Sequence, residues 1–206
     1  MRATIDRFDS LLKSLTQNIC LIAGWALLLL SVVITVNVLF RKVFNYSLQG
    51  VDEYGGYCLA VCASVGFAQA AYDRAHIRID VVTQLFPEAL RAVFDVVALI
   101  VLTLTAGYLA LHAYEVMKTS FEMGALATSS LRTPLGIPQA IWAGALIWFC
   151  VTLTVHSLRA LIKLSRGDWR GVTREFGAAD IQDEVGQEIE LARKRMGAKA
   201  NLAGGN

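Results

Sequence analysis

Four long apolar stretches divide the chain, separated by shorter polar segments. They cover residues 19–40, 54–72, 93–114 and 140–161. Each is close to the roughly 20 residues that a helix needs to cross the hydrocarbon core of a bilayer. None contains an internal proline, and Pro138 lies just before the fourth stretch, where a helix tolerates the missing N–H. The pattern predicts an all-α integral membrane protein whose transmembrane domain, residues 19–165, contains four transmembrane helices.

The segment before the first stretch has an amphipathic pattern. Apolar residues recur at spacings of three and four along it, at Ile5, Phe8, Leu12, Leu15 and Ile19. Charged and polar residues occupy the opposite face, so we expect an N-terminal interfacial amphipathic helix, an arm over residues 1–18. The apolar run that follows is too long for a secretory signal and no cleavage site follows it, so it is predicted to be a retained first span.

Residues 166–206 have a different composition and are predicted to form a charged cytoplasmic tail. A thin apolar stripe within it repeats every three or four residues, at Ile181, Val185, Ile189, Ala192 and Met196. Asp180 could cap such a helix, and the charge order along it suits the helix dipole. Glycines interrupt the pattern, so a helix and a disordered tail both remain open.

The positive charges orient the spans. If the N-terminus is inside, eleven of the lysines and arginines up to Arg174 lie on the cytoplasmic side and four on the outer side. The four outer ones are Arg41, Lys42, Lys118 and Arg132. Because Lys and Arg concentrate in cytoplasmic segments, both termini are predicted to be cytoplasmic.

The composition excludes several other classes of protein. Of 206 residues, 55% are apolar and 17% are charged, whereas a soluble domain carries about 25% charged residues. A net charge of +2 is too small to indicate nucleic-acid binding. The four cysteines all fall in apolar runs and are expected to pack as small hydrophobic residues, so neither a disulfide framework, a metal nor a cofactor is predicted.

The spans offer little chemistry of their own. No ionisable residue lies in the middle of any of them, and His112 and His156 lie near helix ends, where an interfacial hydrogen bond is the ordinary interpretation. A transport pathway needs polar groups near the bilayer midplane, so these helices suit a scaffold better than a pathway. The chain contains no G-x-S-x-G, H-E-x-x-H or glycine-rich phosphate motif. We therefore predict no catalytic residue and no enzyme.

Small residues line two faces of the second stretch. One face carries Gly56, Ala60, Ser64 and Ala68, and the other carries Cys58, Cys62, Gly66 and Ala70. Small side chains let helix backbones approach closely in a membrane, so this helix is expected to pack on two neighbours, most simply within its own bundle.

Polar residues bracket the second stretch. Asp52 and Glu53 open it, close in sequence to Arg41 and Lys42, and the four could form a salt-bridged clasp. These acids and Arg41 are candidate structural or partner-contact residues at the outer end.

At the inner end the candidates are His76, Arg78 and Asp80. His76 and Asp80 are four residues apart and could share a metal, but no third ligand accompanies them. A hydrogen-bonded turn between the second and third spans is the favoured interpretation, in which Arg78 reaches a lipid phosphate or a partner's carboxylate.

These residues, taken in order, resemble the small membrane subunit of tripartite ATP-independent periplasmic (TRAP) transporters. The likeness covers roughly residues 10–165. It rests on Arg41, the Asp52–Glu53 pair, the segment from His76 to Asp80, and the run Thr133-Pro134-Leu135-Gly136-Ile137-Pro138 ahead of Trp142. The His-Ile-Arg-Ile-Asp segment is the most specific of these. Val51, where an aromatic residue often stands, and the charged tail after Asp168 depart from the family pattern.

The resemblance implies a partner, a location and a function. Such subunits lie in the bacterial inner membrane, contact its lipids, and pair with a large multi-helix membrane subunit that holds the substrate and sodium sites. A periplasmic solute-binding protein delivers a carboxylate-bearing solute. The small subunit is expected to brace the large one and help dock the binding protein. The alternative is a stand-alone four-helix membrane protein, either an assembly factor or a small enzyme of lipid metabolism.

Overall fold

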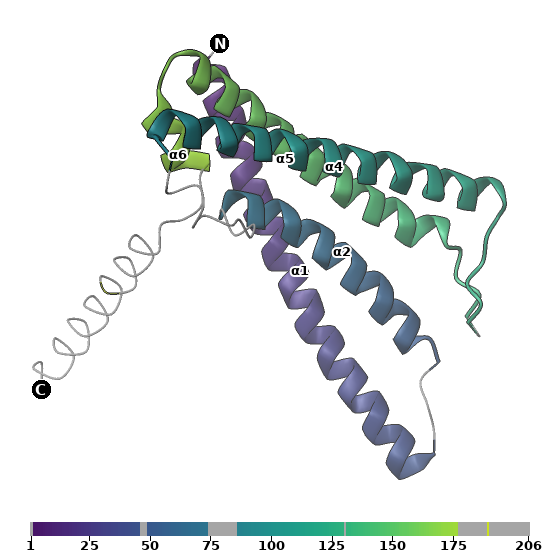
Figure 1. Cartoon of the computed structure of the whole chain (residues 1–206). Coiled ribbons are helices and arrows are strands. Elements are labelled where there is room, and N and C mark those ends of the chain that lie inside the picture. The colour runs from purple at the N-terminus through teal and green to yellow at the C-terminus, as the bar shows by residue number, and fades with distance from the viewer. Residues whose placement is uncertain (1, 46–48, 74–85, 130, 177–188, 190–206) are drawn as a thin grey trace, which may run out of the picture.

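The computed structural model describes residues 2–45, 49–73, 86–129, 131–176 and 189, and all statements below concern these residues. They form five helices and one isolated β-bridge. The helices are α1 (Arg2–Phe44), α2 (Val51–Tyr72), α4 (Glu88–Glu122), α5 (Gly136–Ser165) and α6 (Trp169–Phe176). Figure 1 shows the long helices α1, α2, α4 and α5, with the short α6 across one end. The predicted all-α class is confirmed.

Three helices are long and apolar enough to cross a membrane: Asp9–Phe44 within α1, Glu88–Glu122 and Gly136–Ser165. The chain is therefore a membrane protein with several candidate spans. Helix α2 has 22 residues and coincides with the second predicted stretch, but its glycines, tyrosines and Gln69 make it less apolar.

Helix α1 contains both the predicted arm and the first predicted span. It runs without interruption for 43 residues, so no helix boundary separates residues 1–18 from 19–40. At 1.5 Å per residue its length is about 65 Å, roughly twice the thickness of the hydrocarbon core. The reason is local: the segment contains no proline and only one glycine, Gly24, and neither Gln17 nor Asn18 ends a helix.

The other long helices also extend beyond the predicted apolar stretches. Helix α4 begins directly after Pro87 and has 35 residues, and α5 begins at Gly136 and has Pro138 in its first turn. Their additional turns are polar or mixed but remain helical. Hydropathy located the part of each helix that suits lipid, whereas the ends follow from capping and turn residues.

Helices α4 and α5 form the best-packed pair. Alanines dominate their contact, including Ala106, Ala113 and Ala143, each about 1% exposed. Such small residues bring two helix backbones close together. Deeper in the pair, the hydroxyl groups of Thr103 and Ser157 lie 2.7 Å apart and form a hydrogen bond between the helices. The hydroxyls therefore satisfy each other where no water is expected.

Helix α2 joins the bundle through its small residues, as predicted. Ser64 and Ala68 are buried, and the rings of Phe67 and Phe149 on α5 lie 5.8 Å apart. On its other side, the Cys62 thiol donates to the carbonyl of Ala23 on α1 at 3.3 Å. Helix α2 thus lies between α1 and α5, and packing within its own bundle is confirmed.

Helix α1 is the most peripheral helix. It meets α5 near one end, where Trp148 Nε1 donates to Thr16 Oγ1 at 3.0 Å and Thr16 is fully buried. Beyond this crossing, α1 and α2 diverge together from α4 and α5 (Figure 1). The apolar residues of α1 are consequently mostly exposed.

The beginning of the predicted tail is an anchored helix. Val172 is fully buried and Phe176 is 6% exposed, both in the core cluster that contains Leu153 and Phe149. Gly167, with φ of 73°, ends α5 and lets the chain turn back. Trp169, Val172 and Phe176 are three and four residues apart, a signal that the sequence offered. Of the predicted helix around 180–196, only Ile189 is among the described residues.

Candidate functional site

Polar side chains gather at two opposite ends of the bundle. One group, here the Asp9 cluster, comprises Asp9 of α1, Tyr72 of α2, His156, Arg159 and Lys163 of α5, and Glu175 of α6. The other, the Glu53 cluster, comprises Glu53 and Tyr57 of α2 and Ser129 of the α4–α5 loop. The alternating directions of the helices bring residues far apart in sequence to the same end.

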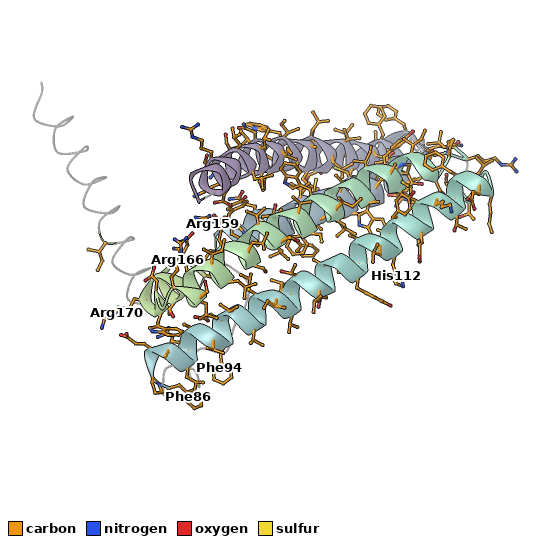
Figure 2. All side chains as sticks on the ribbon, turned by 90° about the horizontal axis from the view of Figure 1, so that it is seen from above. Phe86, Phe94, His112, Arg159, Arg166 and Arg170 are labelled. Atoms are coloured by element: carbon orange, nitrogen blue, oxygen red, sulfur yellow. The ribbon has the colours of Figure 1, made fainter. Side chains whose placement is uncertain are left out.

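Asp9 joins three helices. Its carboxylate accepts a charge-assisted hydrogen bond from Arg159, and the Tyr72 hydroxyl lies 3.5 Å from Oδ1. His156 Nε2 is 3.9 Å from the same oxygen. The side chains of Asp9 and Arg159 are only 14% and 18% exposed, so this ion pair is largely shielded from solvent. Figure 2 shows Arg159 in the region where α5 faces α1.

Glu175 connects the short helix α6 to the same cluster. It accepts from Arg159 Nη2 at 2.5 Å and also from Lys163. Arg159 therefore bridges two carboxylates, one from each end of the described chain. Phe176 lies beneath both cations, with its ring centre 6.0 Å from the Arg159 guanidinium carbon and 5.8 Å from Lys163 Nζ. Two positive charges and two negative charges balance within the cluster.

His156 is buried among aromatic rings. It meets Tyr72 edge to face at 4.7 Å and Phe176 at 5.8 Å. The sequence predicted only an ordinary interfacial hydrogen bond for this residue. The structure instead packs it between α2 and α6, beside Asp9.

The sequence did not reveal the Asp9 cluster. Asp9 and Arg159 are 150 residues apart, and each looked like an ordinary charge on a helix end. The sequence offered one indication. In the predicted topology, Asp9 on the arm and the pair His156 and Arg159 at the inner end of the last span lie at the same depth in the membrane.

The Glu53 cluster links α2 to the loop between α4 and α5. Tyr57 donates to Glu53 Oε1 at 2.8 Å, and the Ser129 hydroxyl donates to Oε2. The backbone hydrogen bonds of the loop include two between its opposite sides, Ala127 N–H to the Thr133 carbonyl at 2.9 Å and Leu135 N–H to the Ala125 carbonyl at 3.0 Å. Glu53 precedes the second predicted span. Its pKa is held below the usual value, chiefly because Ser129 stabilises the ionised carboxylate.

The predicted salt-bridged clasp is not formed. Within the described residues, no ion pair joins Arg41 or Lys42 to Asp52 or Glu53, and Glu53 binds the loop instead. Arg41, Lys42 and Asp52 are exposed, and Gly50, with φ of 86°, starts α2 beside Leu131. Asp52 in the first turn of α2 complements the helix dipole.

The inner candidates His76, Arg78 and Asp80 lie outside the described residues, so their role stays a prediction. Across the described part of the chain, no three His, Cys, Asp or Glu side chains come close enough to hold a metal ion. Figure 2 places His112 on the side of α4 that faces away from the other helices. It contacts its own helix, with Nδ1 3.1 Å from the carbonyl of Tyr108.

Known proteins match most of the chain. Residues 30–167 match the family model described as tripartite ATP-independent periplasmic transporters, DctQ component. A Haemophilus influenzae protein that carries the description TRAP transporter small permease protein is 23% identical over 121 residues, which cover 59% of this chain and 73% of that protein. The match excludes the arm and the tail, so neither is explained by it.

The family match decides between the functional alternatives. The family is a transporter component without enzymatic activity, which confirms that the chain is not an enzyme and sets aside the stand-alone alternative. Such transporters lie in the inner membrane and also contain a large membrane subunit and a periplasmic solute-binding protein. The chain therefore belongs to the DctQ family, the small permease component of TRAP transporters.

Proposed function

We propose that this chain is a rigid brace for the large membrane subunit of a sodium-coupled TRAP transporter that takes up carboxylate-bearing solutes. The observation that carries the proposal is the Asp9 cluster, in which Arg159 ties α1 and α6 to α5 through two carboxylates. Helices clamped at one end by shielded ion pairs suit a fixed support. Between the clusters, residues 14–40, 54–72, 96–114 and 136–158 contain no Asp, Glu, Lys or Arg, which suits a role outside the solute pathway.

We propose four crossings, with both termini cytoplasmic. The position of α2 between α1 and α5 supports the fourth crossing, because its two ends lie at the levels of the Glu53 and Asp9 clusters. The proposed domains are the arm 1–18 as the first part of α1, the transmembrane unit 19–165 and the tail 166–206, beginning with α6. The Asp9 cluster then faces the cytoplasm.

At the periplasmic end, we propose that Arg41, Asp52 and the Glu53 cluster help dock the solute-binding protein. Arg41 and Asp52 are exposed, and Glu53 fixes the α4–α5 loop beside them. A fixed loop presents one surface to a soluble partner and loses little entropy on binding.

The orientation can be tested by cysteine labelling. A membrane-impermeant thiol reagent applied from outside should label cysteines introduced at positions 42–50 and 120–132, but not at 73–80 or 170–176. The charge distribution predicts this result. Labelling of the 73–80 segment from outside would contradict the proposed topology.

Glu53→Gln should weaken docking of the binding protein, whereas solute preference should not change. The neutral amide accepts more weakly from Ser129, so the loop loses its attachment to α2. Asp52→Asn and Arg41→Ala, on exposed residues, should have smaller effects. Docking is measured as binding of the solute-binding protein to the reconstituted complex, and solute preference by competition between solutes. An altered solute preference would contradict the proposal.

Because the pKa of Glu53 is lowered, the difference in docking between wild type and Glu53→Gln should depend on pH. The contribution of the ionised carboxylate is complete above its ordinary pKa and is lost as the pH falls through the lowered value. As the pH falls into the acid range, docking of the binding protein to the wild-type complex should therefore become as weak as docking to the Glu53→Gln complex.

Asp9→Asn should destabilise the bundle by about 2 kcal/mol, because Arg159 then keeps one carboxylate while remaining shielded. Asp73→Asn is the matched control, since Asp73 is an exposed acid at the same end. Unfolding in detergent measures the difference. In a double-mutant cycle, Asp9→Asn and Arg159→Gln should be less than additive; full additivity would show that the pair carries no coupling.

For the segment outside the described residues, we propose that His76, Arg78 and Asp80 fix the turn after α2 and contribute no chemistry. A His–Asp pair one turn apart can satisfy backbone groups as the chain leaves the bilayer. His76→Ala or Asp80→Ala should lower the amount of assembled complex in liposomes but leave uptake per assembled complex nearly unchanged. Normal assembly with collapsed uptake would refute this.

A further inference from the structure

An apolar groove lies between α1, α2 and α5. Its volume is about 520 Å³, and its lining includes Ala26 and Val33 of α1, Tyr54 and Val61 of α2, and Ile141 of α5. No Asp, Glu, Lys, Arg or His is among the residues that line it. Space is left between these helices because α1 and α2 diverge from α4 and α5 (Figure 1).

The polar side chains in the lining leave little for a ligand to bind. The Tyr57 hydroxyl donates to Glu53 Oε1 at 2.8 Å, and the Cys62 thiol donates to the carbonyl of Ala23 at 3.3 Å. Tyr54 is 54% exposed near the start of α2, where a phenol ring suits the boundary between hydrocarbon and headgroups. The groove therefore suits a hydrocarbon ligand that needs no hydrogen bond from its walls.

The size of the groove favours a single hydrocarbon chain over a helix. Along α1 the groove extends from Ile19 to Val33, which is about 21 Å at 1.5 Å per residue. The acyl chains of one leaflet cover half of the hydrocarbon core, roughly 15 Å, so one chain fits lengthwise. A helix about 21 Å long and about 10 Å in diameter occupies roughly 1,600 Å³, about three times the volume of the groove.

A cation lies beyond the outer end of the groove, on the same face of α1. The α1 positions that line the groove are 19, 22, 23, 26, 29, 30 and 33, and the same repeat of three and four residues continues to Arg41. Helix side chains tilt toward the N-terminus, so a long side chain at position 41 can reach back toward the groove. Arg41 is exposed, and no ion pair joins it to another described residue. Lys42 has the same charge and level but belongs to the opposite face of the helix.

We propose that the groove holds one acyl chain of an outer-leaflet phospholipid, whose phosphate binds Arg41. A guanidinium and a phosphate form paired, charge-assisted hydrogen bonds, and the apolar lining covers the chain. The inference rests on the proposed topology and bracing function, because a filled groove keeps α1 and α2 at a fixed distance from α5. A helix of the large subunit or of a second copy of this chain is too wide for the same space.

The test uses the full transporter in vesicles of phosphatidylethanolamine and phosphatidylglycerol, with a trace of phosphatidylethanolamine that carries a diazirine in one acyl chain. The transporter is extracted in detergent, washed free of loosely held lipid and illuminated. The label should map to α1 between Ile22 and Val33, and the exposed face of α4 around Leu104 should stay unlabelled. No label on the small subunit, or equal labelling of both helices, would overturn the inference. The first of these results is expected if another helix fills the groove.

Two pairs of variants test the groove and the phosphate contact. Ala26→Trp places a ring in the groove, and Ala98→Trp places the same ring on an exposed position of α4. Labelling of α1 should fall about tenfold in Ala26→Trp, because the ring and the acyl chain need the same space, and should match wild type in Ala98→Trp. Arg41→Gln should lower labelling about fivefold, whereas Lys42→Gln should not. Wild-type labelling of Ala26→Trp or of Arg41→Gln would contradict the assignment.

Recovery of the small subunit with a tagged large subunit, measured on the same samples, tests the proposed function separately. If the wild-type chain is recovered with the large subunit but the groove is not labelled, the lipid assignment fails and the bracing function stands. If the groove is labelled but the small subunit is not recovered with the large one, the bracing function fails and the lipid site stands.

Discussion

The ion pair between Asp9 and Arg159 is the contact on which the arrangement of the helices depends. Helix α1 otherwise meets α5 mainly through Thr16 and Trp148, and its apolar surface is mostly exposed. Because Arg159 also binds Glu175, the same guanidinium holds the beginning and the end of the described chain. A guanidinium suits this position, since its planar fork can serve two carboxylates at once and keeps its charge when shielded. Tyr72 and His156 then complete the cluster with α2.

The two helix pairs play different parts because their surfaces differ. Helices α4 and α5 use alanines and a hydrogen-bonded pair of hydroxyl groups, so their backbones come close together. Helices α1 and α2 meet through fewer buried residues, and the apolar side chains of α1 are mostly exposed. The packed core of the described chain is therefore centred on α4 and α5.

Periodicity predicted the helical class, the apolar centres of the helices and the small-residue packing of α2, because each of these depends on local spacing. It did not predict the continuity of α1, since an amphipathic arm and an apolar span differ in composition but not in backbone conformation. It also paired Glu53 with Arg41 or Lys42, the nearest cations in sequence, whereas the fold brings Ser129 closer. The Asp9 cluster could not be derived from spacing at all, because it depends on the relative depth of helices 150 residues apart.

Because α1 is one continuous helix, the distance between its two ends is fixed. Arg159 fixes Asp9 in depth, so α1 cannot slide along its own axis. From Asp9 to Arg41 the helix rises about 48 Å at 1.5 Å per residue, and this distance is set by the backbone alone. A thicker or thinner membrane must then be accommodated by tilt of the helix or by deformation of the lipid. In the proposed topology, the depth of Asp9 on one side of the membrane therefore sets the height of Arg41 and Lys42 on the other side.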